Sequence, residues 1–170
     1  MGKYLITGVS GAGKSTVIGE LQKRGFTAYD TEELPDLAPM LDRRTGKFVD
    51  KSQANGDFKR FVIVLQEDKL KELLDSDETV FLSATGHNQS DFYPLFNNIF
   101  ALIIDESTQE HRLATRTNND TGNNPIDREY LVSGNQRVQS KLLDIGAIAI
   151  DATKPLTKVI DSILSHIDES

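Results

Sequence analysis

The stretch ITGVSGAGKST, positions 6–16, brings glycines, a lysine and hydroxyl side chains together at fixed spacing. It satisfies the pattern G-x-x-x-x-G-K-[ST], and it lies between a short apolar run and a segment of helical period, the context in which this pattern forms a phosphate-binding loop. Glycines let backbone N–H groups converge on an anion, and the start of the following helix adds partial positive charge. The expected nucleotide-binding residues are Gly8, Ser10, Gly11, Ala12, Gly13, Lys14, Ser15 and Thr16.

Two side chains in this stretch have expected roles in the chemistry of a bound triphosphate. Lys14 is positioned in such loops to reach the β and γ phosphates, and Ser15 offers its hydroxyl to Mg²⁺. We therefore expect ATP and Mg²⁺ as cofactors, with Lys14 also acting in catalysis. The loop by itself fits a GTP switch, an ATPase or a kinase.

Motifs elsewhere in the chain discriminate among these three classes. A GTP switch normally carries a D-x-x-G segment and a guanine-reading N-K-x-D or T-K-x-D, and neither pattern occurs in this chain. An ATPase or nucleotide-dependent regulator is favoured by ALIIDE, in which an apolar run ends in Asp105 as a Walker B strand does. Asp105 equally fits the N-cap of a following helix. The sequence leaves these two interpretations of Asp105 open.

A kinase is favoured by acidic residues after the second predicted strand, in AYDTEEL. Asp30 ends that strand, and the carboxyl ends of neighbouring parallel strands open onto one crevice, so this carboxylate should face the phosphate loop. There it would hold a water on Mg²⁺ or orient an acceptor hydroxyl. Glu32, two residues on, is the next candidate for contact with the acceptor.

Two arginines precede a polar loop in EHRLATRTNND. Arg112 and Arg116 are four residues apart, so they share one face of a helix. Guanidinium groups beside a loop that closes over a site stabilise the charge of a transferred phosphoryl group. We expect a lid over residues 112–127, with its loop at 118–127, and a catalytic role for Arg116 and for Arg112.

These residues need a scaffold, and the pattern of apolar residues predicts an α/β fold. Strands are expected at Lys3–Thr7, Thr27–Asp30, Thr79–Ala84, Phe100–Ile104 and Ala147–Ile150, in a parallel sheet wrapped by helices. Helices are expected after the glycine loop, over 58–74 from Phe58, Phe61, Val62 and Leu65, and over 156–167. Residues 43–57 are expected to form a polar loop.

Composition limits the partners. The chain has 170 residues, 19 Lys and Arg against 26 Asp and Glu, a formal net charge of -7, and no cysteine. We expect one domain spanning 1–170, without disulfides or a basic surface for nucleic acid. No segment has the length of a membrane span, and a cytoplasmic protein without a membrane or nucleic-acid partner is expected. The pattern carries no signal for oligomeric state.

The chain resembles small-molecule kinases of the shikimate and gluconate kinase kind, within the nucleoside monophosphate kinase fold. The resemblance covers most of the chain. Its segments are GVSGAGKST, AYDTEEL for D-x-D, VFLSATG for a strand ending in T-G-G, RTNND for the lid start R-T-x-x-D, and the closing AIAIDATKPLTKVIDSIL. The resemblance implies a P-loop three-layer fold with strand order 2-3-1-4-5. It also implies Asp30 on Mg²⁺, Glu32 near the acceptor, and Arg116 and Pro155 beside the adenine.

The chain departs from this family at the positions that contact substrate. It has DFKRFVIV in place of F-R-x-x-E, Thr85-Gly86-His87-Asn88 in place of T-G-G-G, and Asn123-Asn124 in place of a second lid arginine. Residues 43–75 are the expected acceptor-binding segment, with Arg60 and Gly86 as candidate contacts. The resemblance thus implies phosphoryl transfer from ATP to a small metabolite of open identity. The alternatives are a nucleoside or nucleotide kinase and an ATPase or regulator that uses Asp105.

Overall fold

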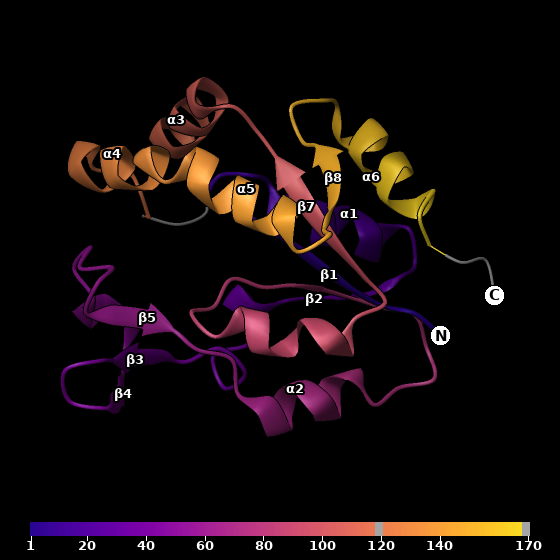
Figure 1. Ribbon diagram of the computed structural model, residues 1–170, viewed down its shortest axis with the longest axis horizontal. Coiled ribbons are helices and arrows are strands. Elements are labelled where there is room, and N and C mark those ends of the chain that lie inside the picture. Colours follow the sequence, from indigo (N-terminus) through magenta and orange to yellow (C-terminus); the bar gives the residue numbers. More distant parts are fainter. Residues whose placement is uncertain (118–120, 168–170) are drawn as a thin grey trace.

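The computed structural model describes residues 1–117 and 121–167, and its centre is a five-stranded parallel sheet (Figure 1). The strand order is β2-β6-β1-β7-β8, and every pairing is parallel. Counted along these five strands, this is the order 2-3-1-4-5, so the expected fold class is confirmed. The strands are β1 (Lys3–Gly8), β2 (Thr27–Asp30), β6 (Val80–Ser83), β7 (Asn98–Ile103) and β8 (Ile148–Asp151).

Helices cover both faces of this sheet, which explains why its strands are nearly continuous apolar runs. On one face α1 (Lys14–Lys23) and α6 (Leu156–Leu164) pack against strand residues such as Phe100 and Leu102. The alternate residue Ala101 faces the other side, where α5 (Asn135–Asp144) packs. Also on that side are α2 (Glu67–Leu74) and the 3₁₀ helix η3 (Gln89–Leu95).

A second, three-stranded antiparallel sheet corrects two sequence predictions. It consists of β3 (Met40–Asp42), β4 (Lys47–Val49) and β5 (Phe61–Ile63), in the order β4-β3-β5. The predicted helix over 58–74 is therefore wrong in its first half, where β5 lies, and α2 begins only at Glu67. The predicted loop over 43–57 is wrong where it contains β4 and the 3₁₀ turn η2 (Lys51–Gln53).

Both errors have the same physical cause. The apolar spacing of residues 58–65 suits a helix, but Val62 pairs with Leu41, far away along the chain. Strands of three residues span too little sequence to show a period of two. The small sheet lies at one end of the molecule, on the same side of Figure 1 as α4 (Pro125–Ser133).

The expected closing helix is confirmed as α6, with Val159, Ile160 and Ile163 buried. The expected lid comprises the end of α3 (Glu106–Thr115), a connection and the start of α4; residues 118–120 of that prediction lie outside the described residues. The helix α4 starts at Pro125, inside the predicted loop, because Asn124 caps it by accepting from Asp127 N–H. No helix in the described part of the chain is long and apolar enough to cross a membrane.

Candidate functional site

The loop between β1 and α1 depends on glycine at its two ends. A Cβ built on Gly8 would lie 2.9 Å from the carbonyl oxygen of Leu102 on β7, closer than real Cβ contacts. Gly13 has φ 99°, in the left-handed region that favours glycine. The loop therefore passes against β7 and turns directly into α1, so that the N-terminus of α1 faces the space beside the loop.

A cavity of about 430 Å³ opens beside this loop. Most of the expected nucleotide-binding residues line it, together with Glu32, Arg112 and Arg116. The full lining is Ser10, Gly11, Gly13, Lys14, Ser15, Thr16, Val17, Glu32, Arg112, Thr115, Arg116, Ala152, Lys154, Leu156 and Val159. Pro155 lies in the chain between the lining residues Lys154 and Leu156. Gly8 and Ala12 are buried and do not line the cavity themselves.

Lys14 extends along the loop and into this cavity. Its Nζ donates to the carbonyl oxygens of Gly8 and Val9, both at 3.0 Å. Burial lowers the pKa of Lys14 to about 8, and the carboxylates of Glu32 and Asp30 oppose that shift. A half-buried cation that lines the cavity is well placed to bind phosphate oxygens.

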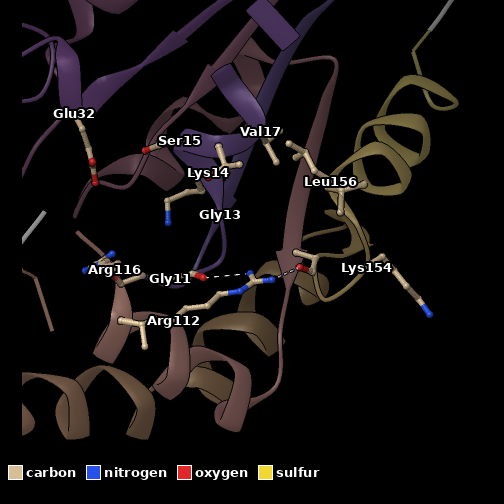
Figure 2. Close-up of a pocket in the computed structure, with 15 residues that line it drawn as sticks. Gly11, Gly13, Lys14, Ser15, Val17, Glu32, Arg112, Arg116, Lys154 and Leu156 are labelled. Atoms are coloured by element: carbon tan, nitrogen blue, oxygen red, sulfur yellow. Dashed lines mark hydrogen bonds between the residues drawn. The ribbon is translucent and has the colours of Figure 1, made fainter. Parts of the chain in front are cut away.

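Arg116 approaches the same space from the end of α3 (Figure 2). Its Nη2 donates to the hydroxyl of Ser10 at 3.2 Å and to the carbonyl of Thr121. Its Nε is buried and has no hydrogen-bond partner, the one such side-chain atom among the described residues. Burial also lowers the pKa of Arg116, against the opposing charge of Glu32. An unpaired buried donor costs free energy, which an anion beside it would relieve.

Arg112 points in a different direction from Arg116. Its guanidinium donates to the carbonyls of Gly11 and Ala12, at 3.4 and 3.3 Å, and to the carbonyl of Ala152 at 2.8 Å. Figure 2 shows the Arg112 side chain extending toward the side of the pocket where Lys154 lies, away from the space between Lys14 and Glu32. The structure therefore places Arg112 as a clamp between the phosphate loop and the residues after β8.

Asp30 and Glu32 lie where the end of β2 meets the loop. Asp30 is buried, and its Oδ1 accepts from the hydroxyl of Ser83 at 3.1 Å and from the Glu32 N–H at 3.0 Å. Both bonds use Oδ1, which leaves Oδ2 outside them. The Glu32 side chain is exposed and lines the cavity, and in Figure 2 its carboxylate points toward the region of Lys14 and Arg116.

The donors around the loop fit a magnesium nucleotide better than a metal held by protein alone. No cluster of three or more His, Cys, Asp or Glu suited to a metal occurs within the described residues. Mg²⁺ usually binds through one or two protein oxygens together with phosphates and water. The Ser15 hydroxyl lines the cavity, and Asp30 is close enough for its charge to act on Lys14. These two residues would hold the ion.

Asp105 adopts the N-cap position that the sequence left open as one alternative. Its Oδ1 accepts from the Thr108 N–H at 2.7 Å, and its Oδ2 accepts from the Thr108 hydroxyl at 2.8 Å. These bonds lower the pKa of Asp105. Both carboxylate oxygens are used at the start of α3, and Asp105 does not line the cavity.

The structure does not bring the candidate acceptor contacts Arg60 and Gly86 into the lining of this cavity. Arg60 forms a two-pronged ion pair with Asp42, at 3.0 and 2.7 Å, across β3 and β5. A Cβ built on Gly86 would lie 3.2 Å from Cγ of Leu65, so the glycine allows close packing there. His87 is exposed, and its N–H donates to the carbonyl of Ile63.

Sequence reasoning missed several residues around the loop. Thr115, Ala152 and Lys154 line the cavity, and the Gln109 amide donates to the Ser10 carbonyl at 3.0 Å. A signal for Gln109 was present, because positions 109, 112 and 116 share one helical face. No comparable signal marks Asn135 and Gln139 of α5: Asn135 donates to Gln109, and Gln139 donates to Asn135.

The fold is shared with solved kinases at low sequence identity. A gluconokinase from Sinorhizobium meliloti 1021 aligns with TM-score 0.58 at 20% identity, over 96% of this chain and 90% of that one. A shikimate kinase from Aquifex aeolicus gives 0.59 at 17% identity, over 96% and 94%. A deoxyadenosine kinase from M. mycoides with bound dATP gives 0.58 at 15% identity, over 96% and 97%.

No curated protein matches the sequence significantly. A family model described as an AAA domain matches residues 5–132, which include the phosphate loop, the small sheet and α3. The match spans well over half of the chain and agrees with the loop geometry above. The chain therefore belongs to the AAA domain family.

Proposed function

We propose that this protein is a kinase that transfers the γ-phosphoryl group of ATP, with Mg²⁺, to a small-molecule acceptor. The observation that carries the proposal is the buried, unpaired Nε of Arg116 beside the phosphate loop. Arg116 and Lys14 line the same cavity, so an anion bound there would meet both cations, as the transfer of a phosphoryl group requires. The shared fold of the gluconate, shikimate and deoxyadenosine kinases supports the same class.

The proposed division of labour follows from the contacts of each residue. Lys14 and Arg116 neutralise the charge that spreads over the transferred group. Asp30, fixed by Ser83, holds its free oxygen toward the acceptor hydroxyl or a water on the metal, and Glu32 contacts the acceptor. Mg²⁺, when bound by Ser15 and Asp30, would screen the phosphate charges and align them.

The acceptor side of the site is formed by residues 43–75, the segment that contains β4, β5 and α2. Its cation Arg60 is already paired with Asp42, so acceptor recognition relies on other groups there. Pro155, next to the cavity residues Lys154 and Leu156, would flank the adenine. The acceptors to be tested in the following experiment include nucleosides as well as sugar acids and polyols.

The test is ADP release from Mg·ATP with pooled acceptors: nucleosides, nucleoside monophosphates, shikimate, gluconate and other polyols. One pool should raise turnover at least tenfold above the rate without acceptor, and splitting that pool then names the substrate. Lys14→Met should reduce this turnover by a factor of about 10³ or more, because the β- and γ-phosphates lose their cation.

The matched control is Lys23→Met, at the exposed end of the same helix α1. It should retain the turnover of the unaltered protein. Full turnover in Lys14→Met would overturn the assignment of the loop, and ADP release that no acceptor pool accelerates would count against phosphoryl transfer.

A further inference from the structure

The phosphate loop is held by side chains along its carbonyl edge. Every carbonyl from Gly8 to Ala12 accepts a hydrogen bond from a side chain: the first two from Lys14, the next from Gln109, and the last two from Arg112. Gln109 and Arg112 are both on α3, so this helix holds the half of the loop that Lys14 does not reach.

Because these carbonyls are fixed by hydrogen bonds, the directions of the neighbouring backbone N–H groups are fixed as well. In a trans peptide the C=O and the next N–H point in opposite directions. Because the Ser10 carbonyl is drawn toward α3, the Gly11 N–H must point away from that helix. Gly11 lines the cavity, and converging N–H groups are what such a loop offers to an anion.

Gln109 is the least solvated of these donors. Its side chain is fully buried, and its Oε1 accepts from the Asn135 amide at 2.8 Å while its Nε2 donates to Ser10. One end of the amide therefore holds the loop, and the other is fixed by α5. A rotation of the amide would break both bonds in a buried place, where unmade hydrogen bonds are costly.

Two more side chains connect Gln109, through hydrogen bonds, to the residue that follows β7. Asn135 Oδ1 accepts from Gln139 Nε2 at 2.8 Å, and both amides donate to the Ile104 carbonyl, at 3.2 and 3.0 Å. Gln139 Oε1 accepts from the Ile104 N–H at 2.9 Å. The three amides form a buried chain, here called the amide ladder (Gln109, Asn135, Gln139), from the sheet to the phosphate loop.

We propose that Gln109 is a positioning residue for the phosphate loop, and that Asn135 and Gln139 of α5 keep it in place. The amide ladder thereby sets the affinity of the loop for the β-phosphate of a nucleotide. This inference rests on the proposed binding of ATP and ADP. It gives α5, a helix that does not line the cavity, a role in nucleotide affinity.

The experiment measures ADP and adenosine binding by displacement of a fluorescent ADP analogue. Gln109→Met keeps the length and volume of the side chain but cannot donate to Ser10. We expect its ADP dissociation constant to rise about tenfold, as befits one lost buried hydrogen bond. Adenosine, which has no phosphate for the loop, should bind as it does to the unaltered protein.

Two further variants make the test specific. Gln139→Met leaves Gln109 in place and should raise the ADP dissociation constant about threefold, since only the support is removed. Gln136→Met, an exposed glutamine of the same helix beside Asn135, should change nothing. The melting temperature of each variant is measured in parallel, so that loss of folding is recognised.

The outcomes separate this inference from the proposed function. Failure of the unaltered protein to bind ADP would reject the proposed function itself. If the protein binds ADP and Gln109→Met binds it equally well, or loses ADP and adenosine affinity in equal measure, the positioning role is overturned. Should Gln109→Met not fold, Gln139→Met decides: a selective loss of ADP affinity supports the ladder, and unchanged affinity refutes it.

Discussion

The proposed nucleotide-binding half of this molecule and its proposed acceptor-binding half, below called the nucleotide half and the acceptor half, are stabilised by different kinds of contact. In the nucleotide half, residues 8–16 form a loop whose carbonyls are bonded by Lys14, Gln109 and Arg112. In the acceptor half, residues 40–63 form a small sheet tied by pairing between β3 and β5 and by the Asp42–Arg60 ion pair. The phosphate loop is held by hydrogen bonds from side chains of α1 and α3, whereas the small sheet is held mainly by contacts within itself.

This difference has a measurable consequence. No residue of the small sheet lines the cavity beside the phosphate loop. Asp30 and Glu32, in the segment that leads from β2 toward the small sheet, form the junction between the two halves, and the ring contact of Phe58 with Tyr130 joins the acceptor half to α4. Changes within the acceptor half should therefore alter the KM for the acceptor and leave ADP affinity unaltered. Changes at the junction should affect turnover most of all.

The largest effect is expected at Asp30, which lies at the junction. Asp30→Asn keeps an oxygen that can accept from Ser83 and from the Glu32 N–H, but it removes the charge and the base. We expect kcat to fall by a factor of about 10²–10⁴, while ADP affinity without metal changes less than about twofold. Steady-state rates with the acceptor found above, and ADP titration, measure the two quantities.

The control is Asp36→Asn, an exposed aspartate a few residues further on. It should have the kcat of the unaltered protein. If Asp30→Asn turned over normally, the acceptor hydroxyl would have to be activated by another residue. Asp30 would then not be the functional link between the two halves.

The sequence predicted the nucleotide half well because its determinants are local. The glycine pattern, the strand before it and the helix after it lie within about twenty residues of one another, and each is visible in the residue types. The five parallel strands were predicted as well, since their buried runs are long enough to stand out. The N-cap role of Asp105 was one of its two predicted alternatives, because a capping residue is also recognised from the residues next to it in the sequence.

The strands of the acceptor half were not predicted because each depends on pairing with a partner strand that the local residue pattern does not reveal. Phe61 and Val62 belong to β5 only because Asp42 and Leu41 pair with them, and the isolated spacing of 58–65 favours a helix. The same holds for the amide ladder: Asn135 and Gln139 lie four residues apart on α5, but nothing in their pattern indicates a partner on α3. The structure of these segments is determined by tertiary packing rather than by the intrinsic secondary-structure propensity of their residues.

A smaller effect is expected at the ring contact between the acceptor half and α4. Phe58 stacks on Tyr130 of α4, with centroids 5.2 Å apart and planes at 13°. Phe58→Leu keeps an apolar side chain but removes the stacking, which is worth about 0.5–1.5 kcal/mol. We expect the acceptor KM to rise about threefold to tenfold because α4 and the acceptor segment no longer hold each other, with ADP affinity unchanged.

The matched change is Phe48→Leu, at an exposed phenylalanine of β4. Its acceptor KM should equal that of the unaltered protein. An acceptor KM that is the same in Phe58→Leu and Phe48→Leu would show that the ring contact plays no part in binding the acceptor.

The smallest effect is a pH dependence confined to the acceptor half. The Arg60 guanidinium, with the backbone N–H of Arg44, holds the pKa of Asp42 well below its usual range. A carboxyl whose pKa is lowered by folding adds stability above its unfolded pKa, near about 4, and loses it as the pH falls through the folded pKa. The excess stability of the unaltered protein over Asp42→Asn should be complete at pH 7 and 5 and shrink at pH 3.

Urea unfolding followed by tyrosine fluorescence measures this difference at each pH, with Asp144→Asn, an exposed residue at the end of α5, as the control that shows no excess. Because neither Asp42 nor Arg60 lines the cavity beside the phosphate loop, ADP affinity at pH 7 should be the same in Asp42→Asn as in the unaltered protein. An excess that persisted undiminished at pH 3 would mean that the Asp42 side chain stabilises the sheet by packing rather than by charge. A loss of ADP affinity would mean that the small sheet supports the phosphate loop after all, and the two halves would then have to be treated as one.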